Sequence, residues 1–487
     1  MDLNWNVIFR VTGALFIVIG FSMIPAMIVS VIYTEPDITG AFIKTIIPSI
    51  LFGGLLILLN KQKEGRTKVR DGYIIVALCW ILASCVAAAP FIISGEIANP
   101  IEAFFETCSG FSTTGASILT DVEAMSKGLL FWRSFTHWLG GMGILIFAIA
   151  LLPSLGISGQ AIAKAETPGP TLDKLTPKLS DTAKMLYLLY LCFTVAETIL
   201  LMFGGLSLFD SLVHTFGTVG TGGFSSYNDS IAHFDSAYVD IIISIFMILS
   251  GVNFNLYFII IRQNLKGFFK DAELRLYLSI IGISTFLIGF YLYAAGDMSN
   301  IWTSFRYSLF QTATIITTTG YVTADFYLWP TFCKMLLLIL MFVGACSCST
   351  GGGVKVIRIL VILKLIKRGI LLKLHPNAFV SLKMNNKPLP VDTSSAITSF
   401  VFLYMFTIFA GTIIVSMDGF SLLTSFSAVV ACLGNIGPGF DLVGPVMNYS
   451  IFSNVSKLLL SFIMLAGRLE LFTIFLLLTP RFWNPNR

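Results

Sequence analysis

FETCSGFSTTGAS (105–117) is the first of four short runs, rich in glycine, threonine and serine, that decide how this chain folds. The other three are VHTFGTVGTGGFS (213–225), FQTATIITTTGYV (310–322) and AVVACLGNIGPGF (428–440). Aligned on one glycine each, they read TTGA, GTGG, TTGY and NIGP, and the aligned residues are Gly115, Gly222, Gly320 and Gly437. These glycines stand 107, 98 and 117 residues apart. A motif that returns about every hundred residues predicts an internal fourfold repeat.

Each run stands between apolar segments that are long enough to cross a membrane. A membrane-spanning helix needs about 20 apolar residues. Ten segments meet this requirement, at about residues 8–33, 40–60, 72–94, 131–152, 183–204, 237–261, 275–295, 332–365, 394–416 and 453–478. Ten spans place both termini on the same side of the membrane. The first segment is too long for a signal-peptide core and lacks a small-residue cleavage pattern, so we expect a retained span.

The composition is typical of a membrane protein with many spans. Of the 487 residues, 56% are apolar and 12% are charged, and the mean hydropathy is +0.85. A soluble protein carries about 25% charged residues, so this composition excludes a soluble enzyme, a nucleic-acid-binding module and a disulfide scaffold. The eight cysteines are scattered, mostly in apolar stretches, and the four histidines have no ligand-like spacing. We expect buried thiols rather than disulfide bonds or metal ligands.

The basic residues are distributed unevenly over the connections between spans, although the net charge is only +5. One set of connections holds nearly all of them: Lys61, Lys63, Arg66, Lys68, Arg70, Lys164, Lys174, Lys178, Arg262, Lys266, Lys270, Lys364, Lys367, Arg368, Lys373, Lys383 and Lys387. Cytoplasmic loops are enriched in Lys and Arg. We therefore expect these connections, and both termini, to be cytoplasmic.

The opposite, outer set of connections is acidic. Its carboxylates are Glu96, Glu102, Glu106, Asp121, Glu123, Asp210, Asp229, Asp235, Asp325 and Asp441. An acidic outer face raises the local concentration of cations, but these charges also fit ordinary solvated loops. The sequence leaves both interpretations open.

The four runs have the composition of re-entrant loops. Irregular backbone at membrane depth persists only where protein or a water-filled cavity covers it. About 10–12 residues before each run suit a half-helix that descends partway into the membrane, and glycine lets the returning backbone adopt positive φ angles. Four such loops around one axis would form a ring of carbonyl oxygens that replaces the hydration shell of a monovalent cation. A single loop also fits a glycine-rich packing motif, but four in equivalent positions favour the ring.

We therefore predict a cation filter made of three residues in each loop. These residues are Thr113, Thr114, Gly115, Gly220, Thr221, Gly222, Thr318, Thr319, Gly320, Asn435, Ile436 and Gly437. No carboxylate stands in the aligned tetrads, so backbone oxygens would hold the cation.

The segment 332–365 is longer than a straight span requires, and GACSCSTGGG (344–353) interrupts it. Glycine costs about 1 kcal/mol relative to alanine inside a helix, so three in succession should open the helix. In a membrane such a break must face the pore or a protein cavity. We predict an intramembrane gate just below the filter, made of Gly344, Ala345, Cys346, Ser347, Cys348, Ser349, Thr350, Gly351, Gly352 and Gly353.

Several polar residues stand within apolar segments. Arg468 and Glu470 lie in the last span, and Lys355 follows the interrupted stretch. Because charges inside a membrane usually face a bundle interior or a cavity, Arg468 fits either a pore-lining role or a salt bridge to another span. Lys355 fits either the pore or snorkelling to the cytoplasmic surface. We expect His137 and Trp138 to be packing residues.

Together the four loops, the two spans before them and the interrupted segment resemble the Trk/Ktr/HKT superfamily of potassium transporters, specifically its bacterial TrkH/TrkG-type membrane subunits. The resemblance covers nearly the whole chain. It implies an all-α membrane protein with two extra N-terminal spans plus four pseudo-symmetric span–pore loop–span repeats around one central pore. The expected units are 1–70 (two N-terminal spans and a cytoplasmic link), 71–182, 183–274, 275–393 and 394–487.

The resemblance also implies roles for individual residues. In that superfamily a glycine in all four filter loops accompanies potassium selectivity, whereas a serine in the first loop accompanies sodium transport in some plant relatives. Gly115 therefore favours K⁺. The fourth loop, NIGPG, departs most from the pattern, so we expect a pseudo-fourfold ring. In the family, the loop at 344–353 is thought to close the pore from the cytoplasmic side, and an arginine at the position of Arg468 to repel cations.

Partners follow from the resemblance as well. The chain carries no nucleotide-binding motif, and we expect no cofactor in it. The family implies a homodimer in the bacterial inner membrane. A cytosolic TrkA-type ring of RCK domains is expected to bind the nucleotide (ATP/ADP or NAD). We expect contacts with membrane lipid and none with nucleic acid.

The sequence thus predicts a potassium uptake protein, not an enzyme, with a K⁺/Rb⁺-selective pore that the intramembrane loop gates and the nucleotide-binding subunit controls. Symport with H⁺ or Na⁺ stays open. One alternative is a weakly selective or Na⁺-permeable transporter of the same architecture. A remote one is a secondary transporter of a small organic solute, which would show inverted repeats with paired binding-site helices. An intramembrane enzyme is more remote, because no paired catalytic residues recur at membrane depth.

Overall fold

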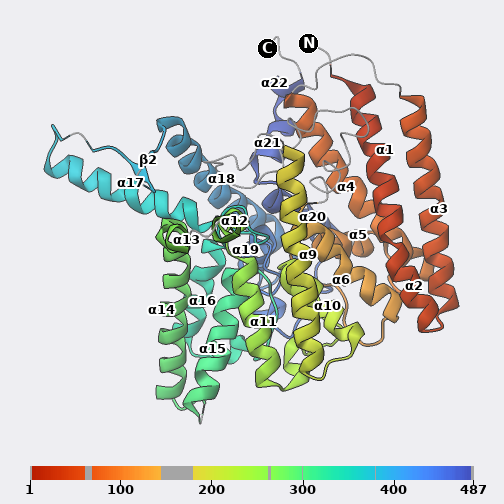
Figure 1. The fold of residues 1–487 in the computed structure, drawn as a ribbon, viewed down its shortest axis with the longest axis horizontal. Helices are drawn as coiled ribbons and strands as arrows, with labels where there is room; N and C mark the ends of the chain where they lie inside the picture. The colour runs from red at the N-terminus through yellow and green to blue at the C-terminus, as the bar shows by residue number, and fades with distance from the viewer. Residues whose placement is uncertain are drawn as a thin grey trace.

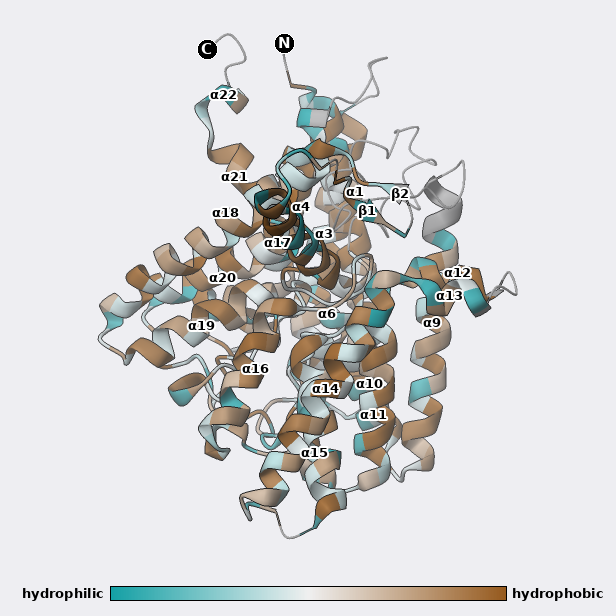
Figure 2. Ribbon diagram, turned by 90° about the vertical axis from the view of Figure 1, so that its left-hand side faces the viewer, coloured by the Kyte–Doolittle hydropathy of each residue, from teal (hydrophilic) through white to brown (hydrophobic). Residues whose placement is uncertain are grey.

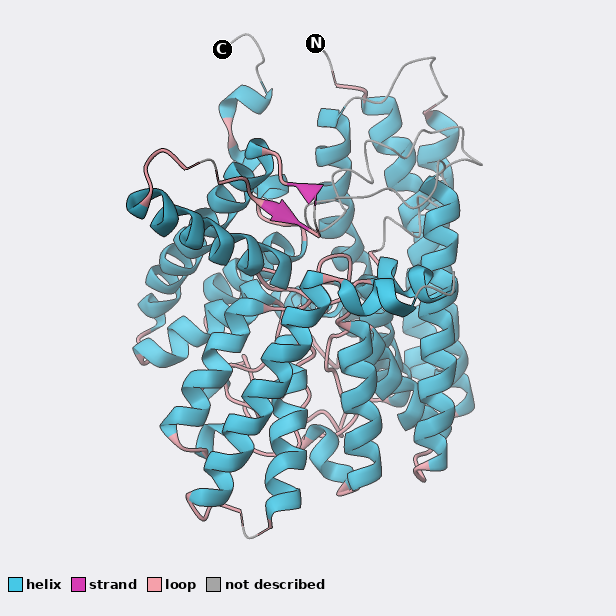
Figure 3. Cartoon of the chain, turned by 60° about the vertical axis from the view of Figure 1, so that its left-hand side comes forward, coloured by secondary structure: helices cyan, strands magenta, loops and turns pink. Residues whose placement is uncertain are grey.

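The structure is a computed structural model that describes residues 3–60, 69–143, 179–261, 265–298, 300–378, 380–385 and 387–483. These residues form a bundle of helices, apart from one antiparallel hairpin of strands β1 (Lys383–Met384) and β2 (Lys387–Pro388) (Figure 3). α1 (Trp5–Ser22) begins and α22 (Pro480–Trp483) ends at the same end of the bundle (Figure 1). The prediction of an all-α membrane fold is confirmed.

The N-terminal helices pack closely against each other. α1 continues with a kink into α2 (Ile24–Ile32), because Pro25 in the first turn of α2 has no backbone N–H to donate. α3 (Pro36–Leu59) runs back along α1. Gly13 and Gly53 stand where these two helices touch, and a β-carbon on Gly13 would lie 2.7 Å from the carbonyl oxygen of Gly53. Small residues permit such close approach between membrane helices.

After α3 the chain passes four times through a long helix, a short helix, an irregular loop and a second helix. The long first helices are α4 (Val69–Ser94), α9 (Leu179–Phe203), α14 (Ala272–Ala294) and α18 (Val391–Val415). The short helices are α5 (Pro100–Phe111), α10 (Leu208–Val219), α15 (Ile301–Ile316) and α19 (Leu422–Gly434). The second helices are α6 (Lys127–Gly141), α11 (Ala237–Ser250), α16 (Thr331–Val343) and α20 (Asn454–Arg468).

Smaller elements connect or extend these helices. They are α12 (Phe254–Ile261), α13 (Leu265–Lys270), α17 (Val356–Leu374) and α21 (Phe472–Leu478), with 3₁₀ turns at η2 (Ser230–Phe234), η3 (Phe326–Leu328), η4 (Ser416–Asp418) and η5 (Asp441–Val443). α17 extends sideways from the bundle, in the half of the molecule that also holds α22 (Figure 1). Because α17 carries many of the predicted cytoplasmic Lys and Arg residues, its position fits the predicted orientation.

Each short helix starts at a side-chain cap. The capping residues are Asn99, Ser207, Asn300 and Ser421, whose side-chain oxygens accept a hydrogen bond from a backbone amide in the first helical turn. Asparagine and serine are preferred at this position because they satisfy an amide that the helix leaves free. The helices then run for only 12 to 16 residues, which is too short to cross a membrane. They are the predicted half-helices.

Six helices in the described part are long and apolar enough to cross a membrane. They are Trp5–Ile32, Pro36–Leu59, Arg70–Ser94, Lys184–Phe203, Ala272–Ala294 and Val391–Asp418. Two bent pairs are further candidates: Ala237–Ser250 with Phe254–Ile260, at 93°, and Asn454–Arg468 with Phe472–Leu478, at 119°. The outer faces of the long helices are rich in apolar residues (Figure 2), and side chains such as Leu58 and Phe203 are more than 70% exposed, as lipid contact requires.

The structure corrects several of the ten predicted spans. The segments 237–261 and 453–478 are broken instead of straight. The interruption predicted within 332–365 is present, because an irregular loop separates α16 from α17. Of 131–152, α6 supplies the part up to Gly141, and residues 144–152 lie outside the described part. Two cysteines expected to be buried, Cys85 and Cys192, are exposed on the surface of the bundle.

Candidate cation filter and gate

All four short helices end in the same hydrogen-bonded turn. In the first, the Thr113 amide donates to the Gly110 carbonyl (3.1 Å) and the Thr114 amide to the Ser109 carbonyl (2.9 Å). The equivalent pairs of donors are Thr221 with Gly222, Thr318 with Thr319, and Asn435 with Ile436. This Schellman arrangement satisfies carbonyl groups that a helix leaves free at its end. Four identical helix ends identify the four runs as structural repeats.

The first residue of each turn has a left-handed backbone conformation. Its φ angle is 55° at Thr113, 55° at Thr221, 60° at Thr318 and 55° at Asn435. Glycine usually takes this position, and a positive φ is unfavourable for a β-branched residue. Each threonine therefore stores strain of order 1–3 kcal/mol, and strain of this kind gathers at functional sites.

Two residues further on, each loop has a glycine with positive φ. The angles are 79° at Gly115, 77° at Gly223, 85° at Gly320 and 96° at Gly437. In the second loop this residue is Gly223, whereas the sequence pattern predicts Gly222. Gly220, predicted as a filter residue, instead caps the C-terminus of α10. The run GTGG has three glycines in four positions, so the sequence alone did not distinguish an alignment on Gly222 from one on Gly223.

Each of these glycines stands directly against the neighbouring loop. A β-carbon on Gly115 would collide with the carbonyl oxygen of Gly222, and one on Gly223 with that of Thr319. A β-carbon on Gly320 would collide with the carbonyl oxygen of Ile436, and one on Gly437 with that of Thr114. The contacts run from the first loop to the second, third and fourth, and back to the first. The four loops therefore close a ring with a carbonyl oxygen at each seam.

Such a ring is suited to a monovalent cation, because backbone carbonyls can replace its hydration shell. Among the residues that the structure describes, no three His, Cys, Asp or Glu side chains are grouped so that they could hold a metal ion. The ring residues themselves are inaccessible from the outside of the bundle: Thr113, Thr221, Thr318 and Asn435 are all 0% exposed. The geometry thus fits binding by backbone oxygens.

The seams of the ring are not identical. In the fourth loop the Asn435 side-chain amide donates to the Thr114 hydroxyl of the first loop (3.0 Å) and to the Met464 carbonyl (2.9 Å). In the third loop the Tyr321 hydroxyl donates to the His214 carbonyl (2.9 Å), behind the second loop. Different side chains therefore support each quarter, as expected for a pseudo-fourfold ring.

His137 and Trp138 pack behind the first two loops. One ring nitrogen of His137 lies 2.8 Å from the Gly110 carbonyl, and the ring centroid is 4.1 Å from that of Phe224. Trp138 stacks on Phe135 and donates its indole N–H to the Thr194 hydroxyl (2.9 Å). The prediction that these two are packing residues is confirmed.

The predicted gate residues, 344–353, form the irregular loop between α16 and α17, which we call the gate loop. It touches the ring, since the Gly352 amide donates to the Thr318 hydroxyl (2.7 Å). The Glu273 carboxylate anchors it by accepting from the Ser347 amide (2.6 Å), the Ser347 hydroxyl (2.7 Å) and the Ile357 amide (3.1 Å). The sequence pattern missed Glu273, because it stands in the first turn of a different helix.

The gate loop also explains why 237–261 is bent. At the break, the Gly251 carbonyl accepts from the Cys346 amide (3.0 Å) and the Phe254 amide donates to the Cys348 carbonyl (3.0 Å). Backbone groups freed inside a membrane need protein partners. The gate loop supplies these partners from another part of the chain.

Arg468 lies between the ring, the gate loop and α6. Its guanidinium donates to the carbonyls of Thr350 (2.6 Å), Gly140 (2.5 Å) and Gly141 (2.7 Å), and Thr113 Oγ1 is 3.3 Å away. Lys355 is 3% exposed and donates to the Gly351 carbonyl, so it does not snorkel to the surface. Two positive charges are thus held beneath the ring.

The break in the last span has its own partner. α20 ends at Arg468, and Glu470 and Leu471 have positive φ angles before α21 begins. Glu470 pairs with Arg358 in the first turn of α17, and Arg358 also stands over the Phe400 ring at 3.8 Å. Glu470 thus has its ion-pair partner on α17.

The outer carboxylates are of two kinds. Asp441 accepts from the hydroxyls of Ser421 (2.6 Å) and Thr424 (2.7 Å), and these hydrogen bonds hold its pKa below the ordinary value. A hydrogen bond from Asn228 likewise lowers the pKa of the exposed Asp121. Glu106, by contrast, is 1% exposed and ion-paired, so it is not the solvated loop charge that the sequence suggested.

Comparisons with known proteins agree over the full length. The family model described as "TrkH: Cation transport protein" matches residues 38–484. The "Trk system potassium uptake protein TrkH" of Salmonella typhimurium is 37% identical over 489 residues, covering 99% of this chain and 100% of that protein. The "Trk system potassium uptake protein TrkG" of Escherichia coli (strain K12) is 34% identical, covering 98% of this chain and 99% of that protein.

The fold is matched as well. The crystal structure of the potassium transporter TrkH from Vibrio parahaemolyticus superposes with a TM-score of 0.89 at 33% identity, covering 99% of this chain and 100% of that chain. The multi-span helical architecture, the re-entrant helices and the sequence likeness lead to one conclusion. The chain belongs to the TrkH family of cation transport proteins, which are transporters and not enzymes.

Proposed function

We propose that this chain is the membrane subunit of a potassium uptake system and passes K⁺ through the ring of four loops. The observation that carries the proposal is the closed circuit of glycine-to-carbonyl contacts around the ring. Such a circuit puts four sets of backbone oxygens from one chain around one axis, which suits a dehydrated monovalent cation. The relatives named as potassium uptake proteins support K⁺ as that cation.

The ion would meet three zones in order. Outer carboxylates such as Asp441 and Asp121 raise the local cation concentration. Below them, the ring removes water from the ion and selects it. The ring residues are Thr113, Thr114, Gly115, Thr221, Gly222, Gly223, Thr318, Thr319, Gly320, Asn435, Ile436 and Gly437.

The third zone is the gate loop with Arg468 and Lys355. Both cations donate to gate-loop carbonyls directly beneath the ring, so the described arrangement is a closed one in which positive charge opposes the exit of K⁺. Opening requires the gate loop to move away from Thr318. α17 follows the gate loop after two residues and carries the basic residues Lys364, Lys367 and Arg368. We assign α17 as the lever on which a cytosolic nucleotide-binding ring acts, in a homodimer of the bacterial inner membrane.

A second candidate is a weakly selective, Na⁺-permeable transporter of the same architecture. The fourth loop supports this alternative, because Ile436 stands where the first and third loops have Thr114 and Thr319, and a proline follows its glycine. A transporter of organic solutes is less well supported, because the ring leaves each glycine in contact with its neighbour.

The test is cation flux into proteoliposomes that contain only this chain, with K⁺, Rb⁺, Na⁺ and Li⁺ compared. Flux of K⁺ and Rb⁺ well above that of Na⁺ and Li⁺ supports a selective pore. Equal flux of all four supports the weakly selective alternative. If the closed gate prevents flux, binding is measured instead. The melting temperature of the purified protein is recorded at increasing concentrations of each cation, because a bound ligand stabilises the folded state.

A further inference from the structure

In three of the four loops, the side chain nine residues before the loop glycine contacts the segment that follows the glycine, which we call the return segment. The four residues at this position are Glu106, His214, Gln311 and Ala428. The first three contact their own return segments: Glu106 accepts from the Ile118 amide (2.9 Å), a His214 nitrogen lies 2.9 Å from the Ser225 hydroxyl, and Gln311 Nε2 lies 3.4 Å from the Thr323 hydroxyl. In the fourth loop the neighbouring Ser427 hydroxyl accepts from the Phe440 amide (3.0 Å). Each short helix is thus tied to its own return segment.

Glu106 alone among these four is a carboxylate, and its charge is matched by Arg133 on α6. Arg133 Nε lies 2.6 Å from Glu106 Oε1, and the same carboxylate accepts from the Ser117 hydroxyl (2.9 Å). The side chains of Arg133 and Glu106 are only 3% and 1% exposed. A buried ion pair fixes its geometry tightly, because either charge left alone is strongly disfavoured.

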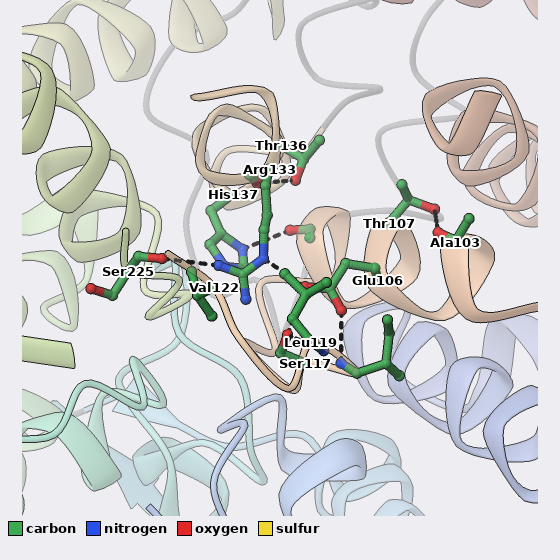
Figure 4. Close-up of polar contacts among 12 residues, drawn as sticks. Ala103, Glu106, Thr107, Ser117, Leu119, Val122, Arg133, Thr136, His137 and Ser225 are labelled. Atoms are coloured by element: carbon green, nitrogen blue, oxygen red, sulfur yellow. Dashed lines mark hydrogen bonds and ion pairs between the residues drawn. The ribbon is translucent and has the colours of Figure 1, made fainter. Parts of the chain in front are cut away.

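Arg133 also crosses to the second loop. Its Nη1 donates to the Ser225 carbonyl (3.1 Å), and its guanidinium lies 3.5 Å from the centroid of the Phe224 ring. Figure 4 shows the Arg133 side chain between Glu106 of the first loop and Ser225 of the second. One guanidinium therefore sets the separation of two return segments just above the ring.

Next to the ring itself, two other seams carry neutral side-chain hydrogen bonds. Tyr321 donates to the second loop from the third, and Asn435 to the first loop from the fourth. Neutral hydrogen bonds are weaker than charge-assisted ones and tolerate larger changes in distance. The seam between the first and second loops is therefore held more rigidly than these two.

We propose that Arg133 is a positioning residue that determines ion selectivity: through Glu106 and Ser225 it holds the first two filter loops at the separation that favours K⁺ over Na⁺. The inference rests on the proposed function and adds to it a residue that stands outside the ring. Arg133 touches no transported ion and acts only through the two return segments.

The chemistry requires arginine at this position. The guanidinium has donors that point in different directions, so it reaches a carboxylate and a carbonyl at once while its flat face covers an aromatic ring. A lysine has one nitrogen and can keep the partner Glu106 only by giving up Ser225 or the face of Phe224. Arg133→Lys thus keeps the charge and removes the bridge.

The experiment compares Arg133→Lys and the double variant Glu106→Gln/Arg133→Gln with the wild-type chain. The double variant leaves no unpaired buried charge, so the proposal can still be tested if Arg133→Lys does not fold. The control is Arg306→Gln, which removes an arginine that pairs with Asp240 at 3.4 Å and joins α15 to α11 without a hydrogen bond to Glu106 or Ser225. Two quantities are measured for each purified protein: the K⁺/Na⁺ flux ratio in proteoliposomes, and the ratio of Na⁺ to K⁺ concentrations that give the same rise in melting temperature.

We expect both ratios to fall about tenfold in Arg133→Lys and in the double variant, the effect of losing one charge-assisted hydrogen bond, and to stay at the wild-type value in Arg306→Gln. A purely structural role would lower the melting temperature without ion and leave both ratios unchanged, which would overturn the proposal. A selective wild type with unselective variants supports it. A wild type that passes and binds K⁺ and Na⁺ equally would overturn the proposed function first, and this inference with it.

Discussion

The backbone amide of Gly352 donates a hydrogen bond of 2.7 Å to the hydroxyl of Thr318, so the gate loop and the ring of four loops are in direct contact. Thr318 is one of the three strained threonines, with φ at 60°. A movement of the gate loop therefore removes a hydrogen bond from a residue that the ring depends on. In the proposed function, gating and selectivity are therefore coupled at this contact.

Replacing Gly115 by serine should weaken discrimination between K⁺ and Na⁺. The new β-carbon would meet the Gly222 carbonyl, and φ at 79° is unfavourable for any residue with a β-carbon. The first two loops must then separate. The K⁺/Na⁺ flux ratio in proteoliposomes measures the effect. Gly282→Ser is the matched control, because Gly282 has no atom within 4 Å of an added β-carbon; an equal change in both variants would contradict the filter assignment.

Deleting Ser347–Thr350 from the gate loop should raise K⁺ flux through the isolated chain. The deletion removes the anchor to Glu273 and the carbonyl that holds Arg468. Flux is measured in proteoliposomes with and without the deletion, at equal amounts of folded protein. A fall in flux in a protein that elutes normally on size exclusion would mean that the segment supports the pore instead of closing it.

Arg468→Gln should raise flux and lower stability together. The substitution removes a positive charge beneath the ring and hydrogen bonds to three carbonyls, whose loss costs about 2–4 kcal/mol in unfolding free energy. The melting temperature and the K⁺ flux report the two effects. Arg481→Gln, at an exposed position on α22, serves as the charge control and should change neither. A stable variant with unchanged flux would show that Arg468 is no barrier.

Acid should destabilise the outer mouth through Asp441. Hydrogen bonds from Ser421 and Thr424 lower the pKa of this carboxyl in the folded state, so its stabilising contribution is complete above the unfolded pKa of about 3.9 and is lost as the pH falls further. Asp441→Asn should make the melting temperature less dependent on pH below about 4. Thr424→Ala, which removes one donor, should have a smaller effect of the same sign. Identical pH profiles for all three proteins would contradict this account.

Much of the fold could be predicted from the sequence because it depends on local chemistry. Asn99, Ser207, Asn300 and Ser421 start the short helices, and a Gly/Thr run ends each one. The long apolar segments follow from length alone. In the second loop the three glycines of GTGG fit two registers, and only contacts with the third loop favour Gly223.

The errors concern partners that are distant in the sequence. Nothing in the segment 237–261 predicts a bend at Gly251, because the groups that satisfy its freed backbone belong to Cys346 and Cys348. Arg133 was missed for a similar reason. It stands in an apolar helix, and its role appears only when Glu106 and Ser225 are seen on either side of it.

The ring is built from one chain, with a different side chain behind each seam. In an assembly of four identical subunits, a single substitution alters all four quarters at once, and a modest change is multiplied. Here a substitution alters one quarter, so an ion on the axis experiences the average of one changed wall and three unchanged ones. In the proposed pore, selectivity can therefore be adjusted one quarter at a time.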